Sequence, residues 1–140
     1  MKRITAVFIS LIVIAAVGCS SSKTAEQETA AIASSGNWLA VIDNGQYADS
    51  WDDAADYMKN IMTKDKWEAV IKSVREPLGK VESRVVRGKT YTTQVPGAPD
   101  GEYVVIEYNT DFENKKGAIE TVTPKLEADG TWKVSGYFVK

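Results

Sequence analysis

The hydrophobic pattern of this 140-residue chain changes its period at Val81, and that change limits the possible folds more than any other feature. Before Val81, apolar residues recur every three or four positions, which is typical of amphipathic helices. After it they alternate with polar residues, which is typical of strands with one buried face. Helices followed by consecutive strands predict an α+β domain, with the helices packed on one face of an antiparallel sheet.

Three helices are expected between residues 31 and 79. The first ends at Asn44-Gly45 and has an apolar stripe at helical spacing, formed by Ala31, Ser35, Trp38, Leu39 and Ile42. The stripe of the second helix consists of Tyr47, Trp51, Ala54, Met58 and Ile61. The third helix begins after Thr63 as its N-cap, stops at Pro77 and Gly79, and is expected to bury Trp67, Val70, Ile71 and Val74.

Four strands are expected after the helices. They cover residues 81–95, 104–112, 118–128 and 132–138, and the segments between them are rich in Gly, Pro, Asn and Asp. In the first strand, Val81, Ser83 and Val85 should share a face. In the second, the shared face should hold Val104, Ile106, Tyr108, Thr110 and Phe112. In the last strand, the face should hold Trp132, Val134, Gly136 and Phe138.

The N-terminal segment is typical of an export signal. Lys2 and Arg3 precede an apolar run that ends at Gly18, and Cys19 follows directly. The tetrapeptide Ala16-Val17-Gly18-Cys19 resembles the lipobox of bacterial lipoproteins, in which the cysteine is lipidated and becomes the mature N-terminus. Residues 1–18 are therefore interpreted as a lipoprotein signal peptide, 19–29 as a flexible tether and 30–140 as the α+β domain. A secretory peptide cut nearby and an uncleaved anchor helix are the alternatives.

Lipidation of Cys19 would make the membrane the first partner of this chain. A diacylglyceryl thioether together with an N-acyl group such as palmitate anchors a protein stably, whereas a single acyl chain does not. Ser20, rather than Asp, after the cysteine resembles lipoproteins sent to the outer membrane of double-membraned bacteria. The expected location is thus the bacterial cell envelope, at the outer membrane and facing the periplasm.

Composition excludes several kinds of function. The chain has no histidine and a single cysteine, so Ser-His-Asp catalysis, Cys-His catalysis and His-ligated metal sites are ruled out. The net charge is −2, and the signal segment holds two basic residues and no acidic one, so the mature chain is more acidic still. Nucleic acid requires a basic surface and is not an expected partner. No metal site and no cofactor are expected.

Several ordered motifs of the domain resemble bacterial domain-of-unknown-function family 4019. The quoted segments are 38–47 (WLAVIDNGQY), 96–103 (PGAPDGEY), 112–115 (FENK), 120–122 (ETV) and 130–137 (GTWKVSGY). The resemblance runs from Trp38 to the C-terminus and implies no assigned activity. The order of helices and strands is similar to the cone-shaped nuclear-transport-factor-2-like fold, which hosts enzymes, ligand binders and association modules alike.

Four residues are candidates for a pocket or a buried ion pair. Glu120 shares a strand face with Ala118 and Val122, and a carboxylate buried there needs a partner, for which Arg75 is the best candidate. Exposure on an outer sheet face and catalysis are the alternative roles of Glu120, because the alternation does not settle which face points inward. Tyr108 and Trp132 are candidates to line a pocket.

The function expected from the sequence is that of a lipid-anchored envelope protein that binds a small apolar ligand or an envelope protein without catalysing a reaction. The alternative is an enzyme that uses a carboxylate base and a tyrosine in the cone pocket. No spacing in the sequence singles out a set of catalytic residues, and no catalytic residue is assigned.

Overall fold

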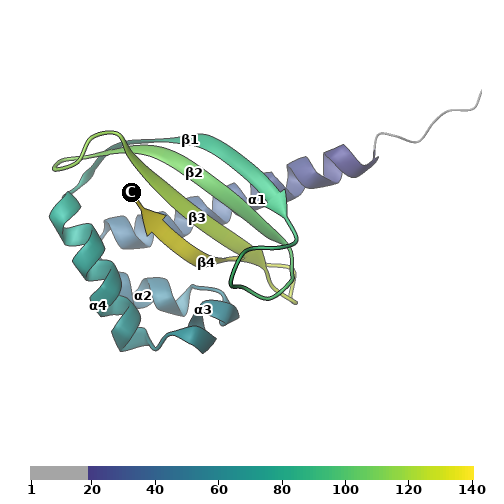
Figure 1. Ribbon diagram of the computed structural model, residues 1–140, viewed down its shortest axis with the longest axis horizontal. Helices are drawn as coiled ribbons and strands as arrows, with labels where there is room; N and C mark the ends of the chain where they lie inside the picture. Colours follow the sequence, from purple (N-terminus) through teal and green to yellow (C-terminus); the bar gives the residue numbers. More distant parts are fainter. Residues whose placement is uncertain (1–18) are drawn as a thin grey trace, which may run out of the picture.

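The computed structural model describes residues 19–140, in which helices precede a four-stranded sheet (Figure 1). The helices are α1 (Cys19–Asp43), α2 (Tyr47–Asp52), α3 (Asp56–Ile61) and α4 (Lys64–Arg75), followed by the 3-10 turn η1 (Glu76–Leu78). The strands are β1 (Val81–Thr92), β2 (Tyr103–Phe112), β3 (Ala118–Leu126) and β4 (Trp132–Val139). The expected α+β class is confirmed, while the likeness to the nuclear-transport-factor-2-like cone stays a prediction.

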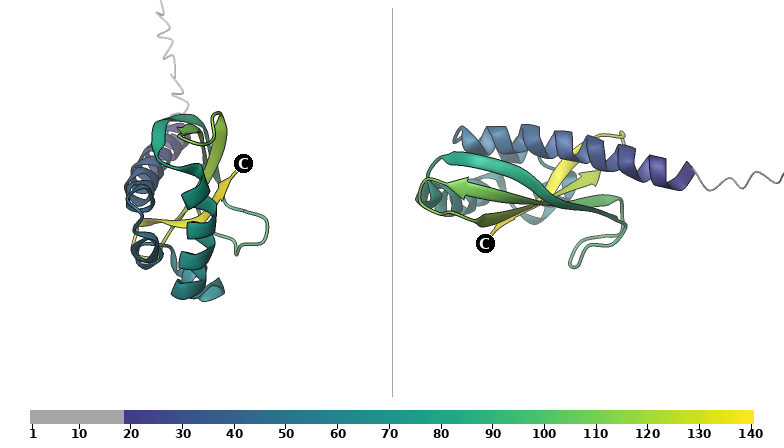
Figure 2. Two further views of the ribbon diagram at one scale, coloured as in Figure 1. Left: turned by 90° about the vertical axis from the view of Figure 1, so that its left-hand side faces the viewer. Right: turned by 90° about the horizontal axis from the view of Figure 1, so that it is seen from above.

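The sheet is an antiparallel meander in the order β1-β2-β3-β4, and α1 crosses one of its faces. Helix α1 contacts all four strands, and helices α2, α3 and α4 lie on the β4 side of the sheet (Figures 1 and 2). The face under α1 is called the inner face here. The space between α1 and this face is filled by core side chains, among them Leu39, Ile42, Ile106 and Val122.

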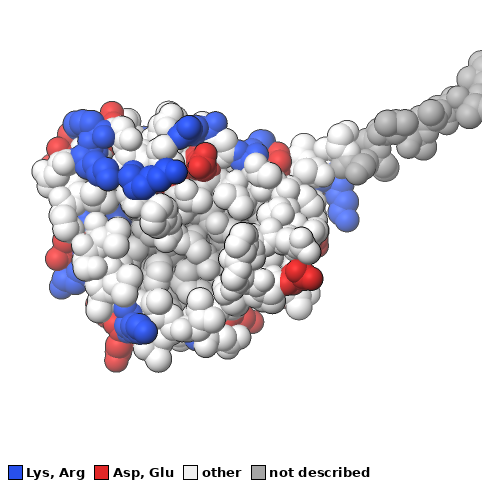
Figure 3. Space-filling view, viewed as in Figure 1, with Lys and Arg blue, Asp and Glu red and all other residues white. Residues whose placement is uncertain are grey.

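The alternation of β2 and β3 sets the inner face. Every second residue of β2 is buried, namely Val104, Ile106, Tyr108, Thr110 and Phe112, as the sequence predicts. In β3 the buried set is Ala118, Glu120, Val122 and Pro124, so Glu120 points inward. The opposite, outer face carries few charges at its centre, and basic side chains lie mainly along one margin of it (Figure 3).

Bulges in the two edge strands shift side chains to faces that simple alternation does not predict. The register of β1 shifts between Val81 and Ser83, which places Arg84 opposite Thr110 and on the inner face. The register of β4 shifts between its pairings with Pro124 and Thr123, so Ser135 is an extra residue. Phe138 is therefore 59% exposed instead of sharing the face of Val134, and Tyr137 takes the inner position.

The prediction of one continuous second helix is wrong. The segment from Tyr47 to Ile61 forms two short helices, α2 and α3, with Ala54 and Ala55 buried between them. The N–H of Ala55 donates to the carbonyl of Val134 in β4 at 2.8 Å, a tertiary bond that ends the helical ladder at this point. Because the two helices point differently, Ile61 leaves the stripe and is 59% exposed.

The buried face of α4 also differs from the prediction. Trp67 and Ile71 are buried as expected, but Val70 is 42% and Val74 38% exposed. The third buried position, one turn after Ile71, belongs to Arg75, whose side chain is 4% exposed. A polar residue thus completes an apolar stripe, because it has acidic partners inside the domain.

The flexible tether predicted over residues 19–29 is helical in the structure, because α1 begins at Cys19. Five of the six residues from Lys23 to Glu28 are lysine, alanine, glutamate or glutamine, which are good helix formers. Side chains also tie the helix to the domain: Gln27 donates to Glu102 at 2.6 Å, and Lys89 lies 3.3 Å from Glu28. The predicted signal peptide, residues 1–18, lies outside the described residues. Within residues 19–140, no helix has the length and apolar character needed to cross a bilayer.

The junction between α4 and β1 depends on Gly79. Its φ is +76°, and a side chain there would meet the Glu113 side chain at 2.7 Å. This close approach allows the N–H of Lys80 to donate to Glu113 at 2.7 Å and the N–H of Asn114 to donate to the carbonyl of Leu78 at 3.0 Å. The β2–β3 turn thereby fixes the end of α4, which carries Arg75.

Candidate functional site

Glu120 lies at the centre of a buried polar cluster on the inner face of the sheet. Its side chain is fully buried. Arg84 Nε donates to Oε2 at 2.6 Å and Arg84 Nη2 to Oε1 at 3.1 Å, which makes a two-point guanidinium–carboxylate pair. The hydroxyls of Thr110 and Tyr137 each donate to the same carboxylate at 2.6 Å. Both carboxylate oxygens are therefore occupied by protein donors.

Asp43, at the end of α1, extends the cluster to the helices and to the surface, because its side chain is 26% exposed. Arg84 Nη1 and Nη2 donate to its two oxygens at 2.6 and 3.0 Å, so Arg84 bridges Asp43 and Glu120. Arg75 Nη2 donates to Asp43 at 2.9 Å. Two guanidinium groups thus face two carboxylates, and the cluster is neutral in sum. These contacts connect α1, α4, β1 and β3.

The predicted pair of Arg75 and Glu120 is brought together, though not as each other's main partner. Arg75 Nη1 lies 3.9 Å from Glu120 Oε1, whereas Arg75 Nη2 lies 2.9 Å from Asp43 Oδ1. The guanidinium also lies over the ring of Phe112, 5.0 Å from the centroid, as a cation–π contact. Its Nε is buried and has no hydrogen-bond partner among the described residues.

Electrostatic effects in the cluster follow from this geometry. Burial alone would raise the pKa of Asp43, but the hydrogen bonds and charges of Arg84 and Arg75 outweigh it and hold the pKa below its usual value. Burial opposes the charged form of Arg84, yet Asp43 and Glu120 raise its pKa above the usual range. Burial, followed by the charge of Glu120, raises the pKa of the Tyr137 hydroxyl. Tyr137 therefore acts as a neutral donor.

Arg84 and Asp43 are the charged cluster members that the sequence analysis misses, and the hydroxyl donors Thr110 and Tyr137 are not among its candidates either. Strict alternation in β1 places Arg84 with the outer residues, and only the bulge at Glu82 turns it inward. Asp43 directly follows the apolar stripe of α1, at the last position of the helix. An acidic residue that directly follows the stripe residue Ile42, on a helix packed against the sheet, is the signal that could have identified it.

Tyr108 lies beside this cluster but belongs to the core. It pairs with Glu120 across the β2–β3 ladder, so the two side chains share the inner face. Its hydroxyl donates to Ser35 Oγ on α1 at 2.9 Å, and both residues are buried. Burial raises the pKa of Tyr108, partly offset by the bond to Ser35. Tyr108 lines none of the hollows described here.

Trp38 connects the cluster to a hollow on the surface of the domain. Its ring packs edge-on against Tyr137 at 5.5 Å and lies 6.0 Å from Trp67. Ser50 fixes both indoles, since its carbonyl accepts from Trp38 Nε1 at 2.8 Å and its hydroxyl from Trp67 Nε1 at 2.9 Å. The 3% exposed Trp38 is therefore held rigidly where it borders the hollow.

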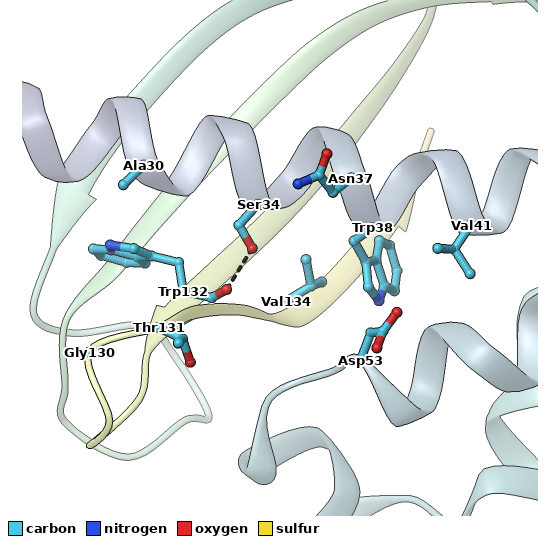
Figure 4. Close-up of a pocket in the computed structure, with 10 residues that line it drawn as sticks. All are labelled: Ala30, Ser34, Asn37, Trp38, Val41, Asp53, Gly130, Thr131, Trp132 and Val134. Carbon is cyan, nitrogen blue, oxygen red and sulfur yellow. Dashed lines mark hydrogen bonds between the residues drawn. The ribbon is translucent and has the colours of Figure 1, made fainter.

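The hollow is an open groove of about 560 Å³ between α1 and the β3–β4 turn, and we call it the tryptophan groove (Figure 4). It is lined by Ala30, Ser34, Asn37, Trp38, Val41, Asp53, Gly130, Thr131, Trp132 and Val134. Trp132, predicted as a pocket residue, stands at one end, and Val134 points into the space between the two indoles (Figure 4). Ser34 Oγ donates to the carbonyl of Trp132 at 2.6 Å and fixes that wall.

The groove differs from the buried cluster in its free polar groups. The side chains of Asn37 and Asp53 are exposed, and neither has a hydrogen-bond partner among residues 19–140. The Thr131 hydroxyl donates to Asp129 at 2.6 Å and keeps its acceptor capacity. An amide, a carboxylate and a hydroxyl are thus available beside two indoles. In the described part of the chain, no three Cys, Asp or Glu residues come together as a metal site.

Comparison with known proteins identifies a family but no activity. A family model described as "Protein of unknown function (DUF4019)" matches residues 34–137. These residues include every cluster member and all but one of the residues that line the groove. Neither the curated proteins nor the solved structures contain a match to the chain.

Proposed function

The chain belongs to the DUF4019 family, which has no assigned function, and from its own site we propose that it is a lipid-anchored envelope protein that binds a ligand in the tryptophan groove. The groove carries this proposal. Ligand sites are concave, mainly apolar and supplied with a few polar groups, with volumes of about 300–1,000 Å³. The groove, at about 560 Å³, has that size and that mixture.

Binding is favoured over catalysis because of the state of Glu120. A general base must reach the proton that it removes from the substrate. Glu120 is fully buried, its oxygens accept from Arg84, Thr110 and Tyr137, and it lines neither the groove nor the two smaller surface hollows. The alternative of an enzyme with a carboxylate base and a tyrosine therefore gains no support from this arrangement.

The anchor part of the proposal rests on Cys19 and its lipobox-like surroundings. Helix α1 begins at Cys19 and reaches the first groove residue, Ala30, after eleven residues, or about 17 Å along the helix axis. A lipid on Cys19 would thus hold the groove close to the membrane on a helical stalk. Mass spectrometry of the mature N-terminus tests this part: a diacylated and N-acylated Cys19 is expected, and an unmodified Cys19 would contradict it.

A thermal-shift screen of the full mature protein tests the binding part. The panel contains envelope phospholipids, small metabolites, neutral glycans and short peptides. A ligand that binds the folded state raises the melting temperature by an amount set by its concentration over Kd. At least one class is expected to raise it, and Trp132→Ala should remove the shift.

Phe138→Ala is the matched control for that screen. It removes an aromatic side chain that is 59% exposed on the outer sheet face, remote from the groove lining. The shift should persist in this variant. If no class raises the melting temperature, or if the shift survives Trp132→Ala, the groove is not the binding site.

A further inference from the structure

The shape of the tryptophan groove favours an elongated occupant. One wall is a straight stripe on α1, formed by Ala30, Ser34, Asn37 and Val41. At the rise of an α-helix, the eleven steps from Ala30 to Val41 span about 17 Å. A compact metabolite would fill only part of this length, whereas a linear oligomer can follow the whole stripe.

The charge of the lining favours a neutral occupant. Among the ten residues that line the groove there is no Lys or Arg, and Asp53 is the single charged residue. Phosphate and carboxylate ligands are recognised by Arg, Lys or helix N-termini, and this lining offers none of the basic side chains. Anionic lipid headgroups and nucleotides are therefore poor candidates.

Strand addition by a peptide is obstructed at the wall formed by β4. A peptide that adds to a sheet needs free main-chain groups on the edge strand. Here the carbonyl of Trp132 accepts from Ser34 Oγ at 2.6 Å, and the carbonyl of Val134 accepts from the N–H of Ala55 at 2.8 Å. The chain itself therefore already uses these two main-chain acceptors of the edge strand where the strand borders the groove.

The remaining groups match the surface of a sugar. A pyranose ring has an apolar C–H face that can lie on an indole, and hydroxyls around its rim that pair with amides and carboxylates. Trp132 offers a partly exposed indole, and Asn37 and Asp53 offer exposed polar groups without protein partners. Ala30, Val41 and Val134 also line the groove with methyl groups, and an acetamido methyl can pack against apolar groups of this kind.

From these four observations we infer that the tryptophan groove binds a neutral, N-acetylated glycan strand, with Trp132 as its stacking platform. The inference rests on the proposed function and narrows its ligand class. A strand of this kind lies along α1, places one sugar ring on Trp132 and directs hydroxyls toward Asn37 and Asp53.

Isothermal titration calorimetry of the full mature protein in detergent tests the inference. The probe is triacetylchitotriose, a trimer of N-acetylglucosamine, and cellotriose, which lacks the acetamido groups, is the matched sugar. Saturable binding of triacetylchitotriose is expected, at least tenfold tighter than that of cellotriose. Trp132→Ala should weaken it at least tenfold, Trp132→Tyr should restore part of the affinity, and Phe138→Ala should leave it unchanged.

Asp53→Asn separates a neutral ligand from a cationic one. An amide still accepts and donates hydrogen bonds, so a glycan should lose less than about fivefold in affinity. A cationic ligand would depend on the charge of Asp53 and lose much more, with a strong dependence on salt.

Two results would overturn the inference. The first is absence of saturable binding of triacetylchitotriose, and the second is binding that is equal for cellotriose or unaffected by Trp132→Ala. If a lipid, metabolite or peptide of the thermal-shift panel binds in a Trp132-dependent manner while the glycan does not, the inference fails and the proposed function stands. If no class binds, both fail.

Discussion

The buried cluster around Glu120 and the tryptophan groove lie along the same helix and use polar groups in opposite ways. At the end of α1, Asp43 belongs to a set of charges whose donors and acceptors are almost all matched by other protein groups. Midway along α1, Asn37 presents an amide with no partner among the described residues. Matched groups hold elements together, and unmatched groups beside an exposed indole are available to a ligand.

Trp38 is the residue that the two regions share. Its ring contacts Tyr137 of the cluster at 5.5 Å and also borders the groove. The comparison therefore predicts a division of effects: changes in the cluster should alter stability first, and changes in the groove should alter binding first.

Glu120→Ala should produce the largest loss of stability. It leaves Arg84 and Arg75 with one carboxylate between them, and breaking a buried ion pair on one side costs about 3–5 kcal/mol of the free energy of unfolding. Urea denaturation measures this loss. Glu107→Ala, which removes a less buried glutamate on the neighbouring strand, is the control and should change stability by less than about 0.5 kcal/mol. A loss below about 1 kcal/mol for Glu120→Ala would show that the cluster is not structural.

Double-mutant cycles should rank the two arginines. Arg84 makes a two-point contact with Glu120, whereas Arg75 approaches it only to 3.9 Å. The coupling energy to Glu120 should therefore be about 2–3 kcal/mol for Arg84 and about 1 kcal/mol or less for Arg75. Equal coupling energies, or the reverse order, would contradict the assigned geometry.

The cluster should also make stability depend on pH in the acidic range. The folded-state pKa of Asp43 is lowered below its unfolded value, so its contribution is present above about pH 4 and is lost as the pH falls through the folded pKa. The free energy of unfolding should thus decrease as the solution is acidified below about pH 4. Asp43→Asn should be less stable at neutral pH and show a shallower acid dependence. An acid dependence equal to that of the wild type would show that the Asp43 carboxylate does not stabilise the fold.

Asn37→Ala should have the smallest effect on stability. The side chain is exposed and has no partner among residues 19–140, so the free energy of unfolding should change by less than about 0.5 kcal/mol. Binding of triacetylchitotriose should nevertheless weaken several-fold by calorimetry. A large loss of stability would instead show that Asn37 supports the fold, and the division between the two regions would fail.

Most of the fold is predictable from periodicity because long, regular segments dominate it. The stripe Ala31, Ser35, Trp38, Leu39 and Ile42 is buried as expected, and so is the inner face of β2. What periodicity misses are single-residue events. The bulge at Ser135 exposes Phe138, and the bond from Ala55 to Val134 divides one predicted helix into two.

The same kind of event limits the prediction of the site. The sequence offers Arg75 as the partner of Glu120 if Glu120 is buried, but it leaves open which face of the strand points inward, and Arg84 turns inward only through the bulge at Glu82. The groove is less predictable still, because its walls come from α1 and from the β3–β4 turn, which are about a hundred residues apart. Trp132 is a candidate by residue type, whereas no sequence pattern singles out Asn37, which lines the same groove.

The indole N–H signals of the four tryptophans in a two-dimensional NMR spectrum test the central claim most directly. Trp132 and Trp38 line the groove, while Trp51 and Trp67 do not. On titration with triacetylchitotriose, the signal of Trp132 should shift most and that of Trp38 next, and those of Trp51 and Trp67 should move little. Shifts confined to Trp51 or Trp67, or no shift of any indole, would contradict the assignment of binding to the groove and of structural support to the cluster.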